Sequence, residues 1–428
     1  MHDFKYKNNE LYCEQVKIAD IADKVSTPFY LYSYNTLLSH YRKLAAAFRA
    51  LSPVICYSMK ANSNLAILRA LVKAGSGLDI VSGGELYKAL LVGGDPKKIV
   101  YASVGKTEEE IRQAVARQIL FFNVESLSEL ELINRVACDL GVNASVALRI
   151  NPDVEPKTHR YITTGKLTNK FGIDLDTAYS IFKNRAEFAH LKFNGLHMHI
   201  GSQIIDGAPY ILAVKKMIGF IKRLKNEAIN IQYLNIGGGL GVIYNKEQPQ
   251  TAEEFAKKVI PLLKDTGLKI ILEPGRFIVG NAGILVVKIL YIKKTPLKNF
   301  VITDAGMNDL IRPSLYGAHH DILPLRKAAA AEWRGAAIGG KAERFDVVGP
   351  ICESGDFFAK DRKLPLLKEG DFLAIMSAGA YGFSMASNYN CRLRPAEAMV
   401  KGSRFYVARK RESYLDLVRK DVIPEFLK

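Results

Sequence analysis

A lysine stands at the end of a short apolar run, where a buried strand would open into a loop. The run covers 54–58 and leads through Met59 to Lys60. Such a run with a polar exit is typical of a buried strand, so the lysine side chain is expected at its carboxyl end. A lysine in a partly dry pocket can lose its proton near neutral pH, and the free amine can attack an aldehyde. A solvated surface lysine is the alternative.

Acidic and hydroxyl residues accompany other apolar runs. Asp79 lies in the second run, Ser82 follows it, and Glu273 ends the eighth. The apolar residues before Glu273 predict that its carboxylate points into a site, where it could keep a pyridine ring nitrogen protonated. An ion pair between Glu273 and Arg276 is the alternative.

A glycine run, GGGLG at 237–241, comes straight after the seventh apolar run. The backbone N–H groups of Gly237, Gly238 and Gly239 could approach a phosphate closely, because no side chain blocks them. Gly275 and Arg276, which follow the eighth run, lie where barrels commonly add to a phosphate site. A simple tight turn is the other explanation for the glycines.

Two histidines, His197 and His199, stand two residues apart on one expected strand and therefore point to the same face. They could stack on a flat cofactor, pack inertly in the barrel or bind a metal. No matching set of His and Asp ligands follows the other strands, so no metal site is predicted. A lysine, a glycine loop, a carboxylate and an imidazole together describe a site for pyridoxal 5′-phosphate.

The elements that must position these residues form a regular alternation. Helical patterns fill most gaps between eight strand-like runs, which predicts an α/β fold with a TIM-like (β/α)₈ barrel. A doubly wound open sheet is the alternative. The expected strands cover 54–58, 78–81, 99–103, 119–124, 145–150, 193–199, 232–236 and 269–273.

A second, mostly β domain is expected after 280, where strand-like runs have few long helical segments between them. The predicted division is a pyridoxal-phosphate-binding barrel over 27–280 and a β-rich domain made of 1–26 plus 281–428. A segment rich in Ala and Gly, 327–341, is expected to be a flexible surface loop. The expected strands cover 282–291, 299–304, 345–348, 372–377 and 402–408.

Composition narrows the class of protein. The 428 residues are 48% hydrophobic, as in a soluble globular protein, and the first residues lack the apolar core of a signal peptide. Five scattered cysteines without a CxxC pair indicate neither a disulfide framework nor structural zinc. The net charge of +17 is spread along the chain rather than gathered in a basic tail. We therefore expect a cytoplasmic protein with no nucleic-acid or membrane partner.

The motifs together resemble the barrel-type, alanine-racemase-like family of pyridoxal-phosphate enzymes, in the branch that contains ornithine, arginine and diaminopimelate decarboxylases. The resemblance covers nearly the whole chain. It is carried by YSMKAN at 57–62, HMHIGS at 197–202, GGGLG at 237–241 and EPGR at 273–276. It implies that Lys60 binds the cofactor's aldehyde, that His199 stacks on the ring and that Glu273 meets the ring nitrogen. The other cofactor residues that it implies are Asp79, Ser82, Ser202, Gly237, Gly238, Gly239, Gly275, Arg276 and Tyr381.

Segments after the barrel resemble the diaminopimelate decarboxylases more closely than the other members. In DAGMNDLIRPSLY at 304–316, the resemblance implies that Arg312 and Tyr316 bind substrate. In GPICES at 349–354, it implies that Cys352 donates a proton and Glu353 contacts the distal end of the substrate. Arg276 and Tyr381, the latter in AYG at 380–382, would also contact substrate.

The resemblance also implies an assembly and a reaction. Family members insert the Cys352 segment into the partner's site, so a homodimer with shared active sites is expected, with the β-rich domain supplying substrate and dimer contacts. The implied reaction is decarboxylation of meso-2,6-diaminopimelate at its D-centre to L-lysine and CO₂, the last step of lysine biosynthesis. Lys60, Cys352 and His199 would be catalytic, and either Cys352 or Lys60 would deliver the final proton.

Three other functions are alternatives to this one. A polyamine-pathway decarboxylase is disfavoured because Arg312 suits a distal carboxylate. A racemase of this fold family would place an arginine beside the pyridine nitrogen, where Glu273 is found. A binding protein without turnover would be expected to have lost Lys60 or Cys352, and both are present.

Overall fold

The computed structural model describes residues 2–155, 169–327 and 343–428. The chain separates into two compact units, one made of Met1–Leu37 with Val279–Lys428 and the other of Leu38–Ile278. Apart from Lys327, the loop expected at 327–341 lies outside the described residues. None of the helices described is both long and apolar enough to cross a bilayer.

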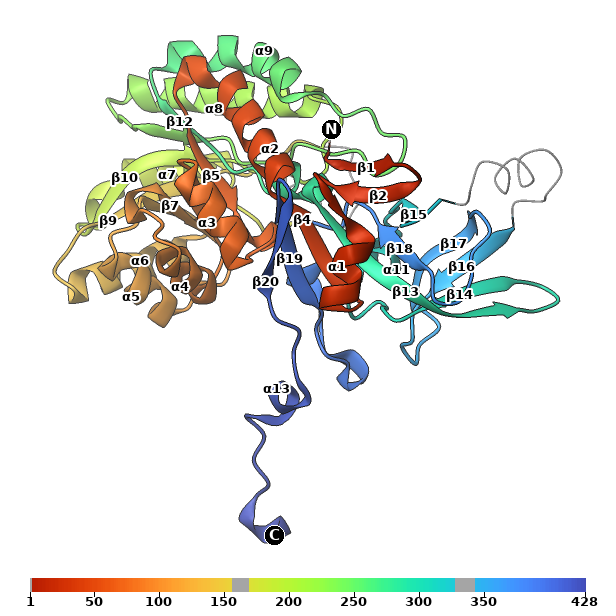
Figure 1. Cartoon of the computed structure of the whole chain (residues 1–428). Coiled ribbons are helices and arrows are strands. Elements are labelled where there is room, and N and C mark those ends of the chain that lie inside the picture. The colour runs from red at the N-terminus through yellow and green to blue at the C-terminus, as the bar shows by residue number, and fades with distance from the viewer. Residues whose placement is uncertain (1, 156–168, 328–342) are drawn as a thin grey trace. The chain divides into compact units, whose positions relative to one another are not determined.

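The unit Leu38–Ile278 contains a closed barrel of eight strands, which confirms the predicted (β/α)₈ architecture (Figure 1). All neighbouring strands in the barrel pair in parallel. Each strand lies within two residues of its expected bounds. In chain order they are β5 (Val54–Ser58), β6 (Gly77–Ile80), β7 (Ile99–Ala102), β8 (Phe121–Val124), β9 (Ala144–Arg149), β10 (Leu191–His197), β11 (Tyr233–Asn235) and β12 (Lys269–Leu272).

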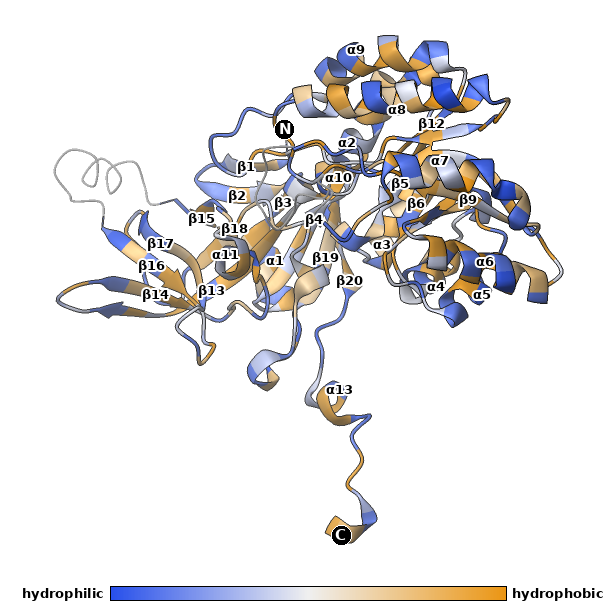
Figure 2. Ribbon diagram, turned by 180° about the vertical axis from the view of Figure 1, so that it is seen from behind, coloured by the Kyte–Doolittle hydropathy of each residue, from blue (hydrophilic) through white to orange (hydrophobic). Residues whose placement is uncertain are grey.

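Helices cover the outside of the barrel and begin where the sequence supplies caps. Ser82 and Ser126 accept hydrogen bonds from the third residue of α4 and α6, and Thr107 and Thr251 form full capping boxes. Hydrophobic and hydrophilic residues alternate along α8 and α9 (Figure 2), as expected of helices with one buried face. The helices are α2 (Tyr34–Ala47), α3 (Leu65–Lys73), α4 (Gly83–Leu91), α5 (Glu108–Ala116), α6 (Leu127–Asp139), α7 (Leu175–Lys183), α8 (Ala208–Asn226), α9 (Ala252–Leu263) and α10 (Arg276–Val279).

The barrel interior has an apolar layer below a polar one. The apolar layer includes buried Cys56, Val100, Phe121, Ala147 and Ile271. Because side chains alternate along a strand, residues two positions further on also face inward, and these lie nearer the carboxyl ends. Apart from Ala102 they are polar, namely Ser58, Asn123, Arg149 and Glu273. The period of two thus places the polar residues of different strands at one end of the barrel.

The other unit is built on a nine-stranded sheet in which distant parts of the chain become neighbours. Strand β4 (Phe29–Ser33) pairs with β13 (Gly283–Lys294) on one side and with β19 (Ala396–Lys401) on the other. A separate three-stranded sheet holds β1 (Phe4–Lys7), β2 (Glu10–Cys13) and β3 (Val16–Lys17), and α1 (Ile18–Val25) follows it. The remaining strands are β14 (Asn299–Thr303), β15 (Ile322–Pro324), β16 (Arg344–Val348), β17 (Phe357–Lys363), β18 (Phe372–Ile375) and β20 (Arg404–Arg409).

Three strands of this sheet, β15, β17 and β19, were not expected from the sequence. Strand β17 lies at the sheet edge, and four charged residues follow its three apolar ones, so its apolar run is short. Strand β19 contains a buried glutamate, Glu397. The hydroxyl of Tyr32 compensates for its burial by donating a hydrogen bond to its carboxylate at 2.7 Å. These segments are strands because they pair with strands that lie elsewhere in the sequence. A local sequence pattern does not reveal such pairing.

Candidate active site

Lys60 and Asp79 meet at the carboxyl ends of neighbouring barrel strands. The Lys60 Nζ lies 3.3 Å from the Asp79 Oδ2, and the hydroxyl of Ser58 donates to the same oxygen at 2.5 Å. Asp79 is fully buried, and its Oδ1 has no hydrogen-bond partner among the described residues. Burial and the charge of Glu273 raise the pKa of Asp79, while Lys60 and Ser58 act in the opposite direction. The amine is therefore fixed by a carboxylate at the mouth of the barrel.

Glu273 is held by three polar side chains from three other strands. Asn123 and Asn235 donate to its Oε1 at 3.2 and 2.5 Å, and the His197 Nε2 lies 3.2 Å from its Oε2. Burial alone would raise the pKa of Glu273, but the charge of His197 and its hydrogen bond, the charge of Lys60 and the hydrogen bond from Asn235 lower it. The carboxylate stays ionised, and the expected alternative, a pair with Arg276, is not the arrangement found.

The two histidines differ in their surroundings, although both come from β10 and the residues just after it. His197 faces Glu273, whereas the His199 Nδ1 accepts a hydrogen bond from the Gly238 backbone N–H at 3.4 Å. Burial and the positive charge of Lys60 lower the pKa of His199 well below its usual value. The neutral imidazole of His199 beside the glycine loop fits the predicted stacking role. His197 instead contacts Glu273, a role that the sequence did not indicate.

The glycine loop leaves space that side chains would fill. Gly237 and Gly239 have φ angles of +69° and +108°, which other residues rarely adopt. A Cβ on Gly238 would lie 2.0 Å from the carbonyl oxygen of Glu273, and one on Gly239 would lie 2.4 Å from that of Gly201. This close approach of bare backbone is what a phosphate cradle needs. With Lys60 for an aldehyde and Glu273 for a ring nitrogen, the residues fit pyridoxal 5′-phosphate.

Arg276 is buried at the same mouth of the barrel. Its Nε and Nη2 donate to the Ser202 hydroxyl at 3.3 and 3.1 Å, and its Nη1 donates to the Tyr244 hydroxyl at 2.7 Å. Gly275, just before it, packs close to Ser58, since an added Cβ would lie 3.1 Å from the Ser58 Cβ. The predicted residues Ser202, Gly275 and Arg276 therefore belong to one group, and Ser82 caps α4, which begins at the mouth.

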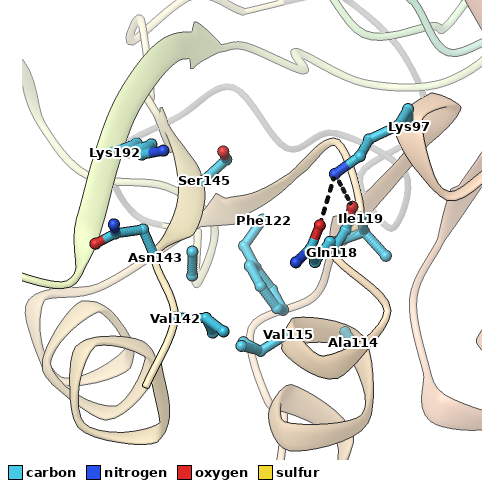
Figure 3. A pocket seen from close by; sticks show the side chains of 11 residues that line it. Lys97, Ala114, Val115, Gln118, Ile119, Phe122, Val142, Asn143, Ser145 and Lys192 are labelled. Carbon is cyan, nitrogen blue, oxygen red and sulfur yellow. Dashed lines mark hydrogen bonds between the residues drawn. The ribbon is translucent and has the colours of Figure 1, made fainter. Parts of the chain in front are cut away.

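A separate cavity of about 330 Å³ lies at the amino ends of β8, β9 and β10 (Figure 3). Ile119, Phe122 and Val142 line it, and the Lys97 amine at its edge donates to the carbonyl and side-chain oxygens of Gln118. None of the predicted site residues lines this cavity. The chemistry of the barrel is therefore concentrated at its opposite, carboxyl end.

The remaining predicted residues lie in the β-rich unit. Arg312 begins the short helix α11 (Arg312–Tyr316) and is buried, with its Nη1 3.0 Å from the His320 Nε2. The His320 Nδ1 lies 2.7 Å from the carbonyl oxygen of Met376. A carbonyl only accepts and a guanidinium only donates, so His320 is neutral and orients Arg312. Arg312 is thus held in place by the fold, unlike a mobile surface arginine.

One carboxylate joins the two motifs that follow the barrel. Asp356 accepts hydrogen bonds from the backbone N–H of Met307 at 2.6 Å and of Ile351 at 2.7 Å. It thereby holds the segment before Arg312 next to the segment of Cys352. The Cys352 backbone N–H donates to the Asn390 Oδ1 at 2.8 Å, while the Cys352 and Glu353 side chains are exposed.

Three predicted residues of this unit, Cys352, Tyr381 and Tyr316, differ in exposure. Without the family resemblance, Cys352 would be taken for a buried thiol, whereas the structure exposes it. Tyr381 is half-buried with φ of +55°, a strained conformation for a residue other than glycine. Tyr316, at the end of α11, is also half-buried.

The sequence prediction missed the partners of Glu273. Asn123 and Asn235 are fully buried and lie two positions after the inward-facing aromatic residues Phe121 and Tyr233. Asparagine is uncommon at buried strand positions, so this spacing was a usable signal. It was overlooked because an amide has no acid–base or nucleophilic chemistry of its own.

Comparison with known proteins places these residues in a family. Residues 35–280 match the family described as pyridoxal-dependent decarboxylase, pyridoxal binding domain. The diaminopimelate decarboxylase of Vibrio cholerae is 47% identical, covering 99% of this chain and 100% of the relative. That of Pseudomonas aeruginosa is 46% identical over 97% of this chain and 98% of its own.

Solved structures agree over the same length. The crystal structure of diaminopimelate decarboxylase from M. jannaschii in complex with L-lysine has a TM-score of 0.92 and 40% identity, and the match covers 99% of both chains. The similarity therefore extends through both units and is not confined to the barrel.

Proposed function

We propose, because this chain belongs to the diaminopimelate decarboxylase family of pyridoxal-dependent decarboxylases, that it removes CO₂ from the D-centre of meso-2,6-diaminopimelate and releases L-lysine, the last step of lysine biosynthesis. The observation that carries the proposal is the convergence of Lys60, the glycine loop and the ionised Glu273 at one mouth of the barrel. The enzyme is a carboxy-lyase that uses pyridoxal 5′-phosphate.

Each residue of the proposed cofactor site has a proposed role. Lys60 would hold the cofactor's aldehyde, Gly237, Gly238 and Gly239 would bind its phosphate, and Glu273 would accept the hydrogen of its ring nitrogen. When bound, the cofactor supplies an electron-withdrawing ring that takes up the electron pair left by CO₂. Asp79, Ser82, His199, Ser202, Gly275, Arg276 and Tyr381 complete the proposed cofactor site.

The proposed substrate residues match the charges of the substrate. Arg276 and Arg312 would bind carboxylates through paired N–H groups, and Glu353 would bind the distal ammonium. Tyr316 and Tyr381 would add hydroxyl contacts. Cys352 or Lys60 would return a proton to the carbon that loses CO₂. The exposed position of Cys352 suits a residue that completes a site in another copy of the chain.

We also propose a homodimer with shared active sites in the cytoplasm, with no nucleic-acid or membrane partner. The division into a barrel over 27–280 and a β-rich domain of 1–26 plus 281–428, which would supply substrate and dimer contacts, stays a prediction. Mixing Lys60→Ala chains with Cys352→Ala chains tests the sharing. If each site takes Lys60 from one copy and Cys352 from the other, the equal mixture should recover about a quarter of wild-type activity. Recovery no greater than that of either variant alone would contradict it.

The reaction itself is tested by measuring CO₂ and L-lysine formed from meso-2,6-diaminopimelate. The matched spectroscopic test looks for an absorption band at ~420 nm, which reports the link between the lysine and the aldehyde. Borohydride should remove this band, and Lys60→Ala should lack it. Release of CO₂ from ornithine or arginine, with none from diaminopimelate, would overturn the substrate assignment.

A further inference from the structure

The orientation of the Asn235 amide follows from its two neighbours. The backbone N–H of Gly237 donates to the Asn235 Oδ1 at 2.9 Å, and a backbone N–H has no other option. The Asn235 Nδ2 must then face the Glu273 Oε1, to which it donates at 2.5 Å. Asn123 donates to the same oxygen at 3.2 Å. With two donors on Oε1, any proton on this carboxyl group would have to lie on Oε2.

His197 occupies the position beside that second oxygen. Its Nε2 is 3.2 Å from the Glu273 Oε2, and its side chain is almost fully buried. An ionised Oε2 can only accept, so Nε2 carries the hydrogen. Protonation of Glu273 would require His197 to give up this arrangement.

Two of these side chains have no other described polar contact. The Nδ1 of His197 and the Oδ1 of Asn123 are buried without a hydrogen-bond partner in 2–155, 169–327 and 343–428. Burying a polar atom without a partner costs free energy, and apolar residues would pack the barrel without that cost. The only side-chain hydrogen bond described for either residue is the one to Glu273. Their presence is therefore explained by the carboxylate.

An ionised carboxylate has about four acceptor positions. Asn123, Asn235 and His197 fill three of them. No donor from the described ranges is found at the fourth position, which could take a donor from a bound molecule.

We infer that Asn123, His197 and Asn235 are positioning residues that hold Glu273 as a carboxylate and leave one of its acceptor positions for the ring nitrogen of the cofactor. This set of three is called the Glu273 clamp below. The inference rests on the proposed function, since it assigns the fourth position to pyridoxal 5′-phosphate. The clamp acts through Glu273 and does not touch the reacting atoms.

Other groups contribute to the electrostatic field around Glu273. Lys60 lowers its pKa, and the charge of Glu273 in turn raises the pKa of Asp79, Cys56 and Tyr210 and opposes the lowering of the His199 pKa. The clamp must therefore be tested with these residues unchanged.

The test uses the full-length holoenzyme and three clamp variants. His197→Leu removes the donor to Oε2, His197→Gln restores an N–H donor on a neutral side chain, and Asn123→Leu removes a donor to Oε1 without adding a charge. His40→Leu is the matched control, because His40 is also buried and bonded, through Nδ1, to the carbonyl of Ile278.

The first readout is an infrared pH titration of the Glu273 carboxyl group, assigned by subtracting the spectrum of Glu273→Gln. In His197→Leu and Asn123→Leu, the protonated carboxyl should appear at a pH higher by about 1–3 units than in the wild type. His197→Gln should recover part of that shift, and His40→Leu should match the wild type. The second readout is cofactor affinity, which should fall about tenfold or more in His197→Leu.

An unchanged titration of Glu273 in both His197→Leu and Asn123→Leu would overturn the clamp. Equal shifts in the clamp variants and in His40→Leu would also overturn it, because they would indicate a general loss of stability. Failure of the wild type to decarboxylate meso-2,6-diaminopimelate would instead overturn the proposed function. The infrared titration does not depend on turnover, so the two failures can be told apart.

Discussion

Lys60 and Asp79 form an ion pair between neighbouring barrel strands, with the amine nitrogen 3.3 Å from a carboxylate oxygen that also accepts from Ser58. The Asp79 side chain is inaccessible, whereas that of Lys60 is 38% exposed. The buried carboxylate of Asp79 therefore holds the Lys60 amine at a position that a bound molecule can reach. In the proposed enzyme, that amine is the group to which the cofactor is attached.

Removing the negative charge of Asp79 should impair the function of Lys60 while the lysine side chain stays present. In Asp79→Asn, the amide can still accept from Ser58 but no longer carries the charge that orients Lys60, so kcat/KM should fall about 10- to 100-fold. Steady-state CO₂ release measures the effect. Asp139→Asn, on the exposed end of α6, is the control and should retain wild-type activity. Unchanged activity in Asp79→Asn would show that Lys60 is positioned by other contacts.

The glycine loop should tolerate no side chain at Gly238. In Gly238→Ala, the added Cβ would meet the backbone oxygen of Glu273 at 2.0 Å, so the loop or β12 must move. The free energy of unfolding should fall by about 1–3 kcal/mol, and cofactor affinity should fall with it.

A second glycine provides the control for that substitution. Gly219 lies within α8, where an added Cβ meets nothing within 4 Å. Gly219→Ala should therefore raise the free energy of unfolding by about 0.5–1 kcal/mol. Urea denaturation measures both variants, and a loss of the same size at both glycines would contradict the explanation from close approach.

Glu85 should make the stability of the protein depend on pH near neutrality. Burial raises its pKa to about 7, although the backbone N–H of Val81 donates to its carboxylate. The pKa in the folded protein is above the ordinary value of 4.5, so the folded state keeps a proton that the unfolded state has lost. Stability relative to Glu85→Gln should therefore decrease as the pH rises through about 7.

The size of that decrease should be about 2–3 kcal/mol between pH 5 and pH 8. It is measured as the difference in free energy of unfolding between wild type and Glu85→Gln at the two pH values. A difference in favour of the wild type that grows as the pH rises would have the wrong sign and would contradict a raised pKa.

Cys352 should affect the chemical step more than substrate binding. If it returns the proton, Cys352→Ala should lower kcat by about 100-fold while KM changes little. Cys138→Ala is the matched control, because Cys138 is also an exposed free thiol but lies on α6. A large rise in KM with kcat preserved would assign Cys352 to binding instead.

The sequence alone determined the barrel and most of its candidate catalytic residues. Apolar runs at regular spacing gave the eight strands within two residues, and the carboxyl ends of parallel strands must meet at one face. Lys60, Asp79 and Glu273 could therefore be grouped before their positions were known. Local periodicity suffices here because each barrel strand is buried on both sides.

Only the tertiary structure decided which partner each of these residues has. It placed Glu273 against Asn123, His197 and Asn235 and gave Arg276 to Ser202 and Tyr244. It also brought β4 and β19 together from opposite ends of the chain. Hydrogen bonds between side chains depend on distances of a few tenths of an ångström across residues far apart in sequence, and a linear pattern does not encode those distances.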